Sequence, residues 1–204
     1  MKNYISIHGQ QIELTEEQVR QILAARQQTE TKLADIAVGT TVKIGGFEMV
    51  ILEQLDGKTA LILKGMYGED MEFAEENNDY RESYVDTKCR QFAQALGQLV
   101  GEENIVPHTV DLTSDDGLED YGTVERQASL ITAQMYRKFV EILDTVNPDC
   151  WWWLATPNST KRHGNAAWVK CVSPSGCVLN HYYCDYGLGV RPFCILKSDI
   201  FVSK

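Results

Sequence analysis

Most of the side chains that could recognise another molecule lie in one stretch near the carboxyl end, residues 158–188. The stretch is rich in aromatic, small polar and charged residues set between short apolar runs. Aromatic side chains give contact area at low entropic cost, and small polar ones add adaptable hydrogen bonds, as in antibody paratopes. We therefore expect a ligand-binding face formed by Asn158, Lys161, Arg162, His163, Asn165, Trp168, Leu179, Asn180, His181, Tyr182, Tyr183, Cys184, Asp185, Tyr186 and Leu188.

The adjacent pair Tyr182-Tyr183 favours exposure of part of this stretch. Successive side chains of a strand point to opposite faces of the sheet, so at least one of the two rings should reach the surface. Composition alone equally allows a tyrosine-rich surface loop whose rings only pack against the protein. The sequence leaves both interpretations open.

A catalytic use of the same stretch is the alternative. Cys184 follows His181 closely, and a thiol beside an imidazole is a nucleophile when an electropositive setting lowers its pKa. Nearness in sequence is weak support for such a dyad. The phosphate-binding patterns GxGxxG and GxxxxGK[ST] do not occur, nor do GxSxG and HExxH. We predict a protein that is not an enzyme and that needs no cofactor.

The cysteines are expected to be free thiols that bind no metal. An even number of cysteines allows disulfides, but the amino terminus lacks the apolar segment of a signal peptide, so we expect synthesis in the cytoplasm and reduced thiols. A protein made in the cytoplasm can still be displayed outside a cell if it is part of a phage particle. The spacings are too wide for a CxxC zinc knuckle, and His163 and His181 fall in no standard ligand register. The six are Cys89, Cys150, Cys171, Cys177, Cys184 and Cys194.

Charge and hydropathy exclude two classes of partner. The chain of 204 residues has a formal net charge of −10, which repels nucleic-acid phosphates and anionic membranes. No window approaches the ~18 apolar residues of a membrane-spanning helix. Hydrophobic residues make up 44% of the chain, enough for a core at this length. We predict a folded protein with neither nucleic-acid binding nor membrane insertion.

The sequence around this stretch predicts a mixed α+β fold. Apolar runs at 47–52 and 59–63 flank Asp56-Gly57, a hairpin signal. Ser83 should cap a helix that ends at Gly101 and buries Val85, Cys89, Phe92, Ala93, Leu96 and Leu99. Thr132 should cap a second helix, which buries Tyr136, Phe139, Val140 and Leu143. Strands are expected at 151–154, 167–172, 177–179 and 189–196.

The acidic run at 111–122 has the composition of a calcium loop. The EF-hand register fails, because Leu112 would occupy the first position when Gly117 takes the sixth. We predict a solvated loop.

Two motifs near the carboxyl end resemble a known family. The run WWLATP at 152–157, followed after a polar stretch by GVRPF at 189–193, is similar to the signature of bacterial and phage C-type-lectin-like domains. Segments 78–85 and 129–132, each with its following helix, look like the two helices of that fold. The resemblance covers about residues 38–200. It implies two helices packed on short antiparallel sheets, with Arg191 structural and bonded to loop carbonyls.

Within that group, the chain resembles the variable proteins of diversity-generating retroelements, in which a reverse transcriptase rewrites adenine-templated codons near the 3′ end of the gene. The resemblance implies a hypervariable face at 158–188 that binds a protein or glycan on a cell surface, as in phage receptor recognition. The sequence lacks the Glu-Pro-Asn and Trp-Asn-Asp motifs of calcium-dependent lectins. An enzyme resembling formylglycine-generating enzymes is disfavoured, because Cys184 and Cys194 are 10 positions apart.

We expect two parts: an extension at 1–36 and a ligand-binding domain at 37–204. Alternation at Tyr4–Leu14 predicts a hairpin, and Thr15 with Gln18 forms a capping box for a helix to about Gln28. The apolar face of this extension is too narrow to fold alone. We expect it to pack either on the domain or on a neighbouring chain. If it packs on a neighbouring chain, the protein forms a homo-oligomer or is a structural component of a virion.

Overall fold

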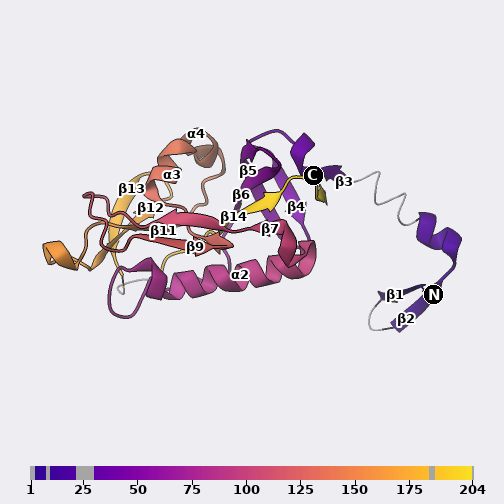
Figure 1. Ribbon diagram of the computed structural model, residues 1–204, viewed down its shortest axis with the longest axis horizontal. Coiled ribbons are helices and arrows are strands. Elements are labelled where there is room, and N and C mark those ends of the chain that lie inside the picture. The colour runs from indigo at the N-terminus through magenta and orange to yellow at the C-terminus, as the bar shows by residue number, and fades with distance from the viewer. Residues whose placement is uncertain (1–2, 8–9, 22–29, 184–186, 204) are drawn as a thin grey trace.

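The computed structural model describes residues 3–7, 10–21, 30–183 and 187–203 (Figure 1). It is mixed α+β, as predicted, with mostly antiparallel sheets and few helices. No helix among these residues has both the length and the apolar character required to cross a membrane.

A curled eight-stranded sheet forms one half of the body. Its strand order is β10-β14-β6-β5-β4-β15-β3, and β7 pairs with β14. The predicted hairpin at Asp56-Gly57 is confirmed, since Leu55 pairs with Lys58 and Gly57 adopts the left-handed φ of 66°. The strands are β3 (Glu30–Lys32), β4 (Thr41–Ile44), β5 (Phe47–Leu55), β6 (Lys58–Leu63), β7 (Ile105–Val106), β10 (Ala128–Ser129), β14 (Phe193–Lys197) and β15 (Phe201–Ser203).

The other half holds a three-stranded sheet, β11-β12-β13, and a two-stranded ribbon, β8-β9. The middle strand β12 is almost wholly buried, whereas the edge strand β13 is mostly open to solvent. A further ribbon, β1-β2, belongs to the amino-terminal extension. These strands are β1 (Asn3–Ile7), β2 (Gln10–Leu14), β8 (His108–Asp111), β9 (Thr123–Arg126), β11 (Trp152–Pro157), β12 (Trp168–Val172) and β13 (Val178–Tyr182).

The long helix α2 (Tyr84–Val100) runs along one side of both halves (Figure 1). Its predicted cap is confirmed, because the Asp86 amide donates to Ser83 Oγ at 3.0 Å, and Gly101 ends it at a φ of 87°. The prediction that Leu99 is buried is wrong: it is 52% exposed.

The second predicted helix is broken in two. α3 (Ala133–Lys138) is capped by Thr132, as expected, but a kink at Phe139 separates it from α4 (Val140–Leu143). Short 3-10 turns complete the body: η1 (Leu33–Asp35), η2 (Tyr80–Glu82), η3 (Glu102–Asn104), η4 (Asp144–Val146) and η5 (Lys161–His163).

Arg191 holds the two halves together at their junction. Its guanidinium is fully buried and lies 5.1 Å from the Trp152 ring centroid. Nε donates to the Leu63 carbonyl at 2.8 Å, and Nη2 to the Val146 carbonyl at 3.1 Å. The predicted structural role of Arg191 is confirmed. Burial lowers its pKa to about 10.

The amino-terminal extension begins as predicted. Gln18 accepts from the Thr15 amide at 2.9 Å, while the Gln18 amide donates back to Thr15 Oγ1 at 3.2 Å, which is the expected capping box. The helix predicted beyond residue 21 lies outside the described residues. Strand β3 and buried Leu33 belong to the main sheet and core, so the folded body already includes part of the segment assigned to the extension.

Candidate ligand-binding face

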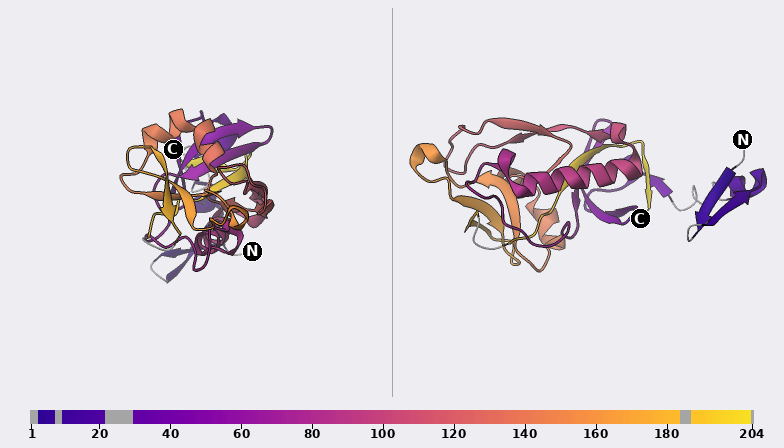
Figure 2. Two further views of the ribbon diagram at one scale, coloured as in Figure 1. Left: turned by 90° about the vertical axis from the view of Figure 1, so that its left-hand side faces the viewer. Right: turned by 90° about the horizontal axis from the view of Figure 1, so that it is seen from below.

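The predicted binding residues gather at one end of the body. The hairpin β12-β13 and the turn η5 lie there, at the opposite end from β3 and the carboxyl terminus (Figure 1). Figure 2, left, looks onto this end. The buried strands β11 and β12 lie behind it, so the exposed side chains stand on a packed sheet.

The edge of the sheet carries three exposed members of the predicted face. Trp168 pairs with Tyr182 in register and meets its ring edge-on, with 5.5 Å between centroids. Trp168 is 41% exposed and Leu179 is 45% exposed, although both are large and apolar. Asn180 lies exposed between Leu179 and Tyr182 along the strand. The register puts Trp168, Asn180 and Tyr182 on one face of the hairpin and Leu179 on the other. Exposed large apolar side chains of this kind are typical of recognition sites.

The two tyrosines at the end of β13 are half-buried. Their rings stack with 5.0 Å between centroids, and Tyr183 also packs on the core. The Tyr183 carbonyl accepts from the Phe73 amide at 2.9 Å, which ties this end of the strand to the preceding loop. His181 lies edge-on to buried Trp153. These residues present part of each ring to solvent and use the remainder for packing.

The turn η5 presents Lys161, Arg162 and His163 to solvent. Thr160 caps the turn, accepting from the Arg162 amide at 3.3 Å, and Gly164 ends it in the left-handed conformation with a φ of 70°. Asn158 and Asn165, at the two sides of the turn, are half-buried.

The acidic run at 111–122 is a largely exposed loop, as predicted, and it also anchors this turn. Asp116 Oδ2 accepts from Ser159 Oγ at 2.6 Å and lies 3.0 Å from His163 Nδ1. Thr160 donates to Asp120, and Lys170 pairs with Asp115 at 2.6 Å. The long-range partners of these carboxylates are invisible in a local pattern.

The electrostatics of the anchor follow from these bonds. Hydrogen bonds from Ser114 and Ser159, with a smaller contribution from His163, lower the pKa of Asp116 to about 2. Burial raises the pKa of Asp115, but hydrogen bonds from Lys170 and Arg137 outweigh it and bring the pKa below its ordinary value. Both carboxylates are therefore ionised, and able to accept, at neutral pH.

Asn78 is a second anchor, which the sequence analysis missed. Its amide nitrogen donates to the carbonyls of Ser159 and Trp168, each at 2.9 Å. Its oxygen accepts from the Tyr121 hydroxyl at 2.8 Å. Asn78 is fully buried and thus joins the acidic loop, the turn and the start of β12. Its neighbours Glu76, Asn77 and Asp79 are also polar, so no local signal distinguishes it in the sequence.

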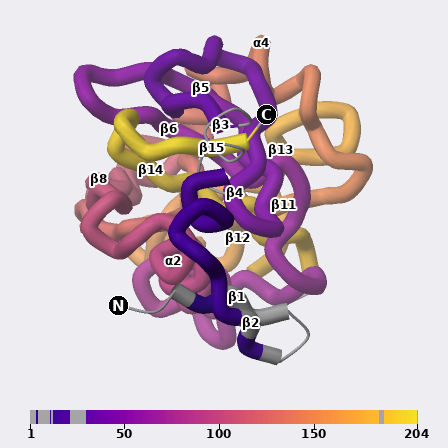
Figure 3. Tube along the Cα trace, turned by 90° about the vertical axis from the view of Figure 1, so that its right-hand side faces the viewer, coloured from indigo at the N-terminus to yellow at the C-terminus, as the bar shows by residue number. Residues whose placement is uncertain are grey.

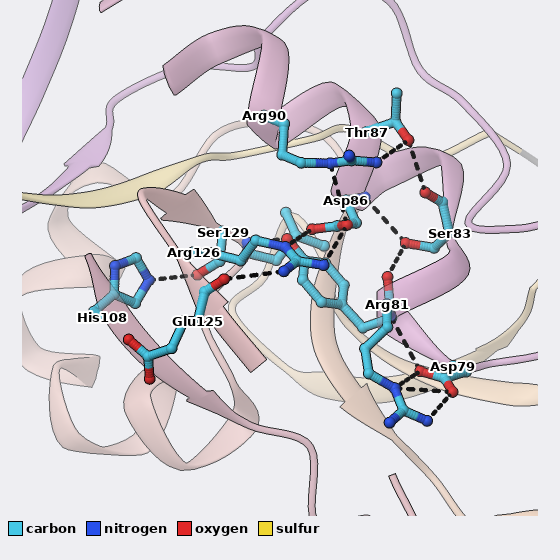
Figure 4. Close-up of polar contacts among 12 residues, drawn as sticks. Asp79, Arg81, Ser83, Asp86, Thr87, Arg90, His108, Glu125, Arg126 and Ser129 are labelled. Atoms are coloured by element: carbon cyan, nitrogen blue, oxygen red, sulfur yellow. Dashed lines mark hydrogen bonds and ion pairs between the residues drawn. The ribbon is translucent and has the colours of Figure 1, made fainter. Parts of the chain in front are cut away.

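A buried polar network next to η2 and α2 supports this anchor (Figure 4). Asp86 is fully buried and receives Arg126 Nε at 2.7 Å and Nη2 at 2.9 Å. Such a bidentate pair fixes β9 against the start of α2. The Leu130 amide donates to the Tyr80 hydroxyl at 3.1 Å, and His108 Nε2 lies 2.8 Å from Ser129 Oγ.

Some predicted residues lie elsewhere. Leu188 is 6% exposed and packs in the core with its backbone paired to Met71, so it supports the face from behind. Cys184, Asp185 and Tyr186 lie outside the described residues. The predicted nucleophile of the enzymatic alternative is one of them.

The five cysteines in the described part of the chain are free thiols. Burial raises the pKa of Cys89, Cys171 and Cys194 to about 12, which disfavours the reactive thiolate. Within the same part of the chain, no group of three or more histidine, cysteine or acidic side chains is arranged to hold a metal ion.

The fold and this surface define a mixed α+β protein with an exposed aromatic and polar face at one end. Residues 119–198, which include most of that face, are similar to a family described as Domain of unknown function (DUF6273). Comparisons with curated proteins and with solved structures gave no match.

Proposed function

We propose that this chain is a non-enzymatic ligand-binding protein that recognises a macromolecule, a protein or glycan on a cell surface, through η5 and the edge of the β11-β13 sheet. One observation carries the proposal: Trp168 and Leu179 are large apolar side chains that are 41% and 45% exposed, on the hairpin formed by the otherwise buried strand β12 and the open edge strand β13. Burying such side chains against a partner stabilises the complex by roughly 25 cal/mol per Å² of apolar surface.

The composition of the face supports recognition of varied ligands. Lys161, Arg162 and Asn180 add exposed polar groups to the same end of the molecule, and interfaces usually combine apolar anchors with polar groups. The buried strands and the anchors at Asn78 and Asp116 fix the backbone beneath these side chains. A rigid scaffold permits replacement of exposed residues at little cost in stability.

The proposal extends to the type of fold and the family of the protein. The WWLATP and GVRPF motifs and the two capped helices support a C-type-lectin-like scaffold. The exposed positions of 158–183 suit the diversified residues of a retroelement variable protein, with phage receptor recognition as the use we propose. Substitutions at these exposed positions would change which ligand is bound without changing the residues of the core.

Binding measurements on matched variants test the proposal. Purified chain is screened against immobilised bacterial surface polysaccharides, purified surface proteins and intact cells. For any probe that binds, Trp168→Ala and Leu179→Asn should each weaken affinity by about tenfold or more, as interface anchors do. Tyr84→Ala is the control, because Tyr84 is a similarly exposed aromatic residue at the start of α2. Equal affinity of the Trp168 variant and the wild type, or an equal loss in the control, would refute this assignment.

A further inference from the structure

Strand β13 is the last strand of the three-stranded sheet, and one of its two edges faces away from β12. The direction of its backbone groups follows from the two hydrogen bonds that bracket the β12-β13 ladder. At one end the Ser173 amide donates to the Cys177 carbonyl at 3.0 Å. At the other end the Tyr183 amide donates to the Ala167 carbonyl, also at 3.0 Å. Both bonds join odd-numbered residues.

Backbone direction alternates along an antiparallel strand, so the register puts the amide and carbonyl groups of Leu179 and His181 against β12. Those of Val178, Asn180 and Tyr182 point outward. Among the described residues, no strand pairs with this side of β13. The Tyr182 carbonyl lies 3.3 Å from His181 Nδ1. The backbone groups of Val178 and Asn180 and the Tyr182 amide are therefore available to another strand.

The outer edge of β13 lacks the features that usually prevent pairing with another chain. Such edges carry charges or a proline, or are very short. The five residues of β13, VLNHY, include no acidic residue, lysine, arginine or proline. Strand β3 differs, because it carries Glu30 and Lys32. It lies at the opposite end of the body, beside a groove lined by Leu99 and Phe201 (Figure 3).

The side chains beside the open edge favour an apolar partner. Leu179 is opposite Cys171, which is opposite Trp153 on β11, so the three side chains form one row across the sheet. Trp153 and Cys171 are buried, whereas Leu179 is 45% exposed at the open end of the row. Adjacent strands lie about 4.8 Å apart, so an apolar residue of an added strand would cover Leu179. Because β13 has no acidic or basic side chain besides His181, an uncharged segment matches it best.

We infer that the ligand is a protein, of which an extended, uncharged segment pairs with the outer edge of β13 as a fourth strand. Outward backbone groups repeat at every second residue, about 6.8 Å apart, and another strand offers donors and acceptors at the same repeat. A polysaccharide backbone lacks alternating amide and carbonyl groups. Main-chain bonds supply affinity in this mode, and side chains beside the edge supply specificity. The inference rests on the proposed function and narrows its ligand from protein or glycan to protein.

Amide hydrogen exchange on the free chain tests the open edge first. The amides of Leu179 and His181 should exchange about tenfold or more slowly than those of Val178, Asn180 and Tyr182, because only the first two donate to β12. Equal protection along the whole strand would show that the outer edge is already covered, and would overturn the inference.

Linear decapeptides selected from a random library are the probes for the partner. Each recovered peptide is resynthesised with single N-methyl groups, which remove one backbone donor at a time and leave every side chain in place. Binding should fall by about tenfold or more at every second position, since alternate amides of an added strand face β13 and solvent. A library that yields no binding peptide, or losses without this period of two, overturns the inference.

Asn180→Pro and Asn180→Ala are the matched pair on the protein. Proline removes the outward amide, a change that edge strands tolerate, whereas alanine removes only the side chain. The proline variant should lose about fivefold more affinity for the peptide than the alanine variant, while thermal unfolding checks that both fold. Equal affinities of the two variants would contradict pairing through the backbone.

The same measurements separate this inference from the proposed function. If a polysaccharide binds through Trp168 and Leu179 and no peptide does, the proposed function stands and strand pairing is wrong. If peptides bind with the period of two and Trp168→Ala leaves their affinity unchanged, strand pairing stands and the anchor assigned to Trp168 is wrong.

Discussion

The two ends of the body expose apolar side chains in opposite ways. At the binding end, Trp168 and Leu179 stand on a backbone fastened from behind by Asn78 and by the acidic loop. At the groove end, Leu99 and Phe201 face an open cavity beside a sheet edge, with no comparable polar anchor described around them.

This difference shows that the same fold exposes apolar side chains on a fastened backbone at one end and around an open groove at the other. Polar anchors fix a backbone while leaving its exposed side chains free to change, which suits recognition of varied ligands. The groove at the other end lies beside the edge strand β3 and is lined by both polar and apolar residues. The following predictions break or sharpen that contrast, beginning with the largest effect.

Removing the central anchor should damage the binding end most. Asn78→Ala removes the side-chain donor to the Ser159 carbonyl and the acceptor for the Tyr121 hydroxyl. It also removes one of two donors to the Trp168 carbonyl, which keeps the Asn158 amide. We expect the free energy of unfolding to fall by about 3 kcal/mol, since each unsatisfied buried group costs about 1–3 kcal/mol. Urea denaturation measures it. The exposed Asn180→Ala is the control and should change little; an equal effect of both substitutions would contradict the anchor.

Lowering the pH should reduce the stability of the protein through His108, which lies in the β8-β9 ribbon. Burial lowers the pKa of His108 to about 4, although Glu125 opposes this. Because the unfolded state has the higher pKa, it binds more protons between about pH 6.5 and pH 4, and stability falls with pH across that window. We expect a loss on the order of 2 kcal/mol, an amount that His108→Gln should abolish. Denaturation at a series of pH values tests this, and parallel profiles for both proteins would refute it.

Stronger acid should open the binding end locally. Ser114 and Ser159 lower the pKa of Asp116 to about 2, so its contribution is present above about pH 4 and is lost as pH falls toward 2. Asp116→Asn should reproduce the change at neutral pH. Hydrogen exchange at 159–165 should then quicken, while exchange in β4 and β15 stays as in the wild type. Uniform acceleration throughout the chain would indicate general destabilisation instead.

Substitution of the exposed face should have the smallest effect on stability. Lys161→Ala, Asn180→Ser and Leu179→Asn remove side chains that contribute little to the core. We expect each to change the free energy of unfolding by about 0.5 kcal/mol or less. Thermal unfolding measures it, and a loss comparable with that of Asn78→Ala would show that the face is part of the scaffold.

Local features were predictable from the sequence. Ser83, Thr132 and Thr15 cap helices because their side chains serve the adjacent amides, and Asp56-Gly57 turns a hairpin because glycine accepts a positive φ. Mixed α+β architecture follows from the order of these elements.

Long-range partnerships were beyond local pattern. Asp116 and Ser159 are 43 positions apart, and nothing near either predicts their bond. Short strands such as β3 and β15 carry too few residues for a recognisable period. The exposed side of Leu99 was missed because helical spacing alone does not reveal where the covering sheet ends. Hence the sequence predicted a candidate binding stretch but not the contacts that hold it in place.

Sequencing the 3′ end of this gene in a natural population tests the central claim most directly. A diversified binding face predicts substitutions concentrated at adenine-templated codons for exposed positions such as Lys161, Arg162, Trp168, Leu179 and Asn180. The buried anchors Ser159 and Thr160 and the core residue Leu188 should stay constant. A uniform stretch, or substitutions falling equally on those buried positions, would contradict the claim.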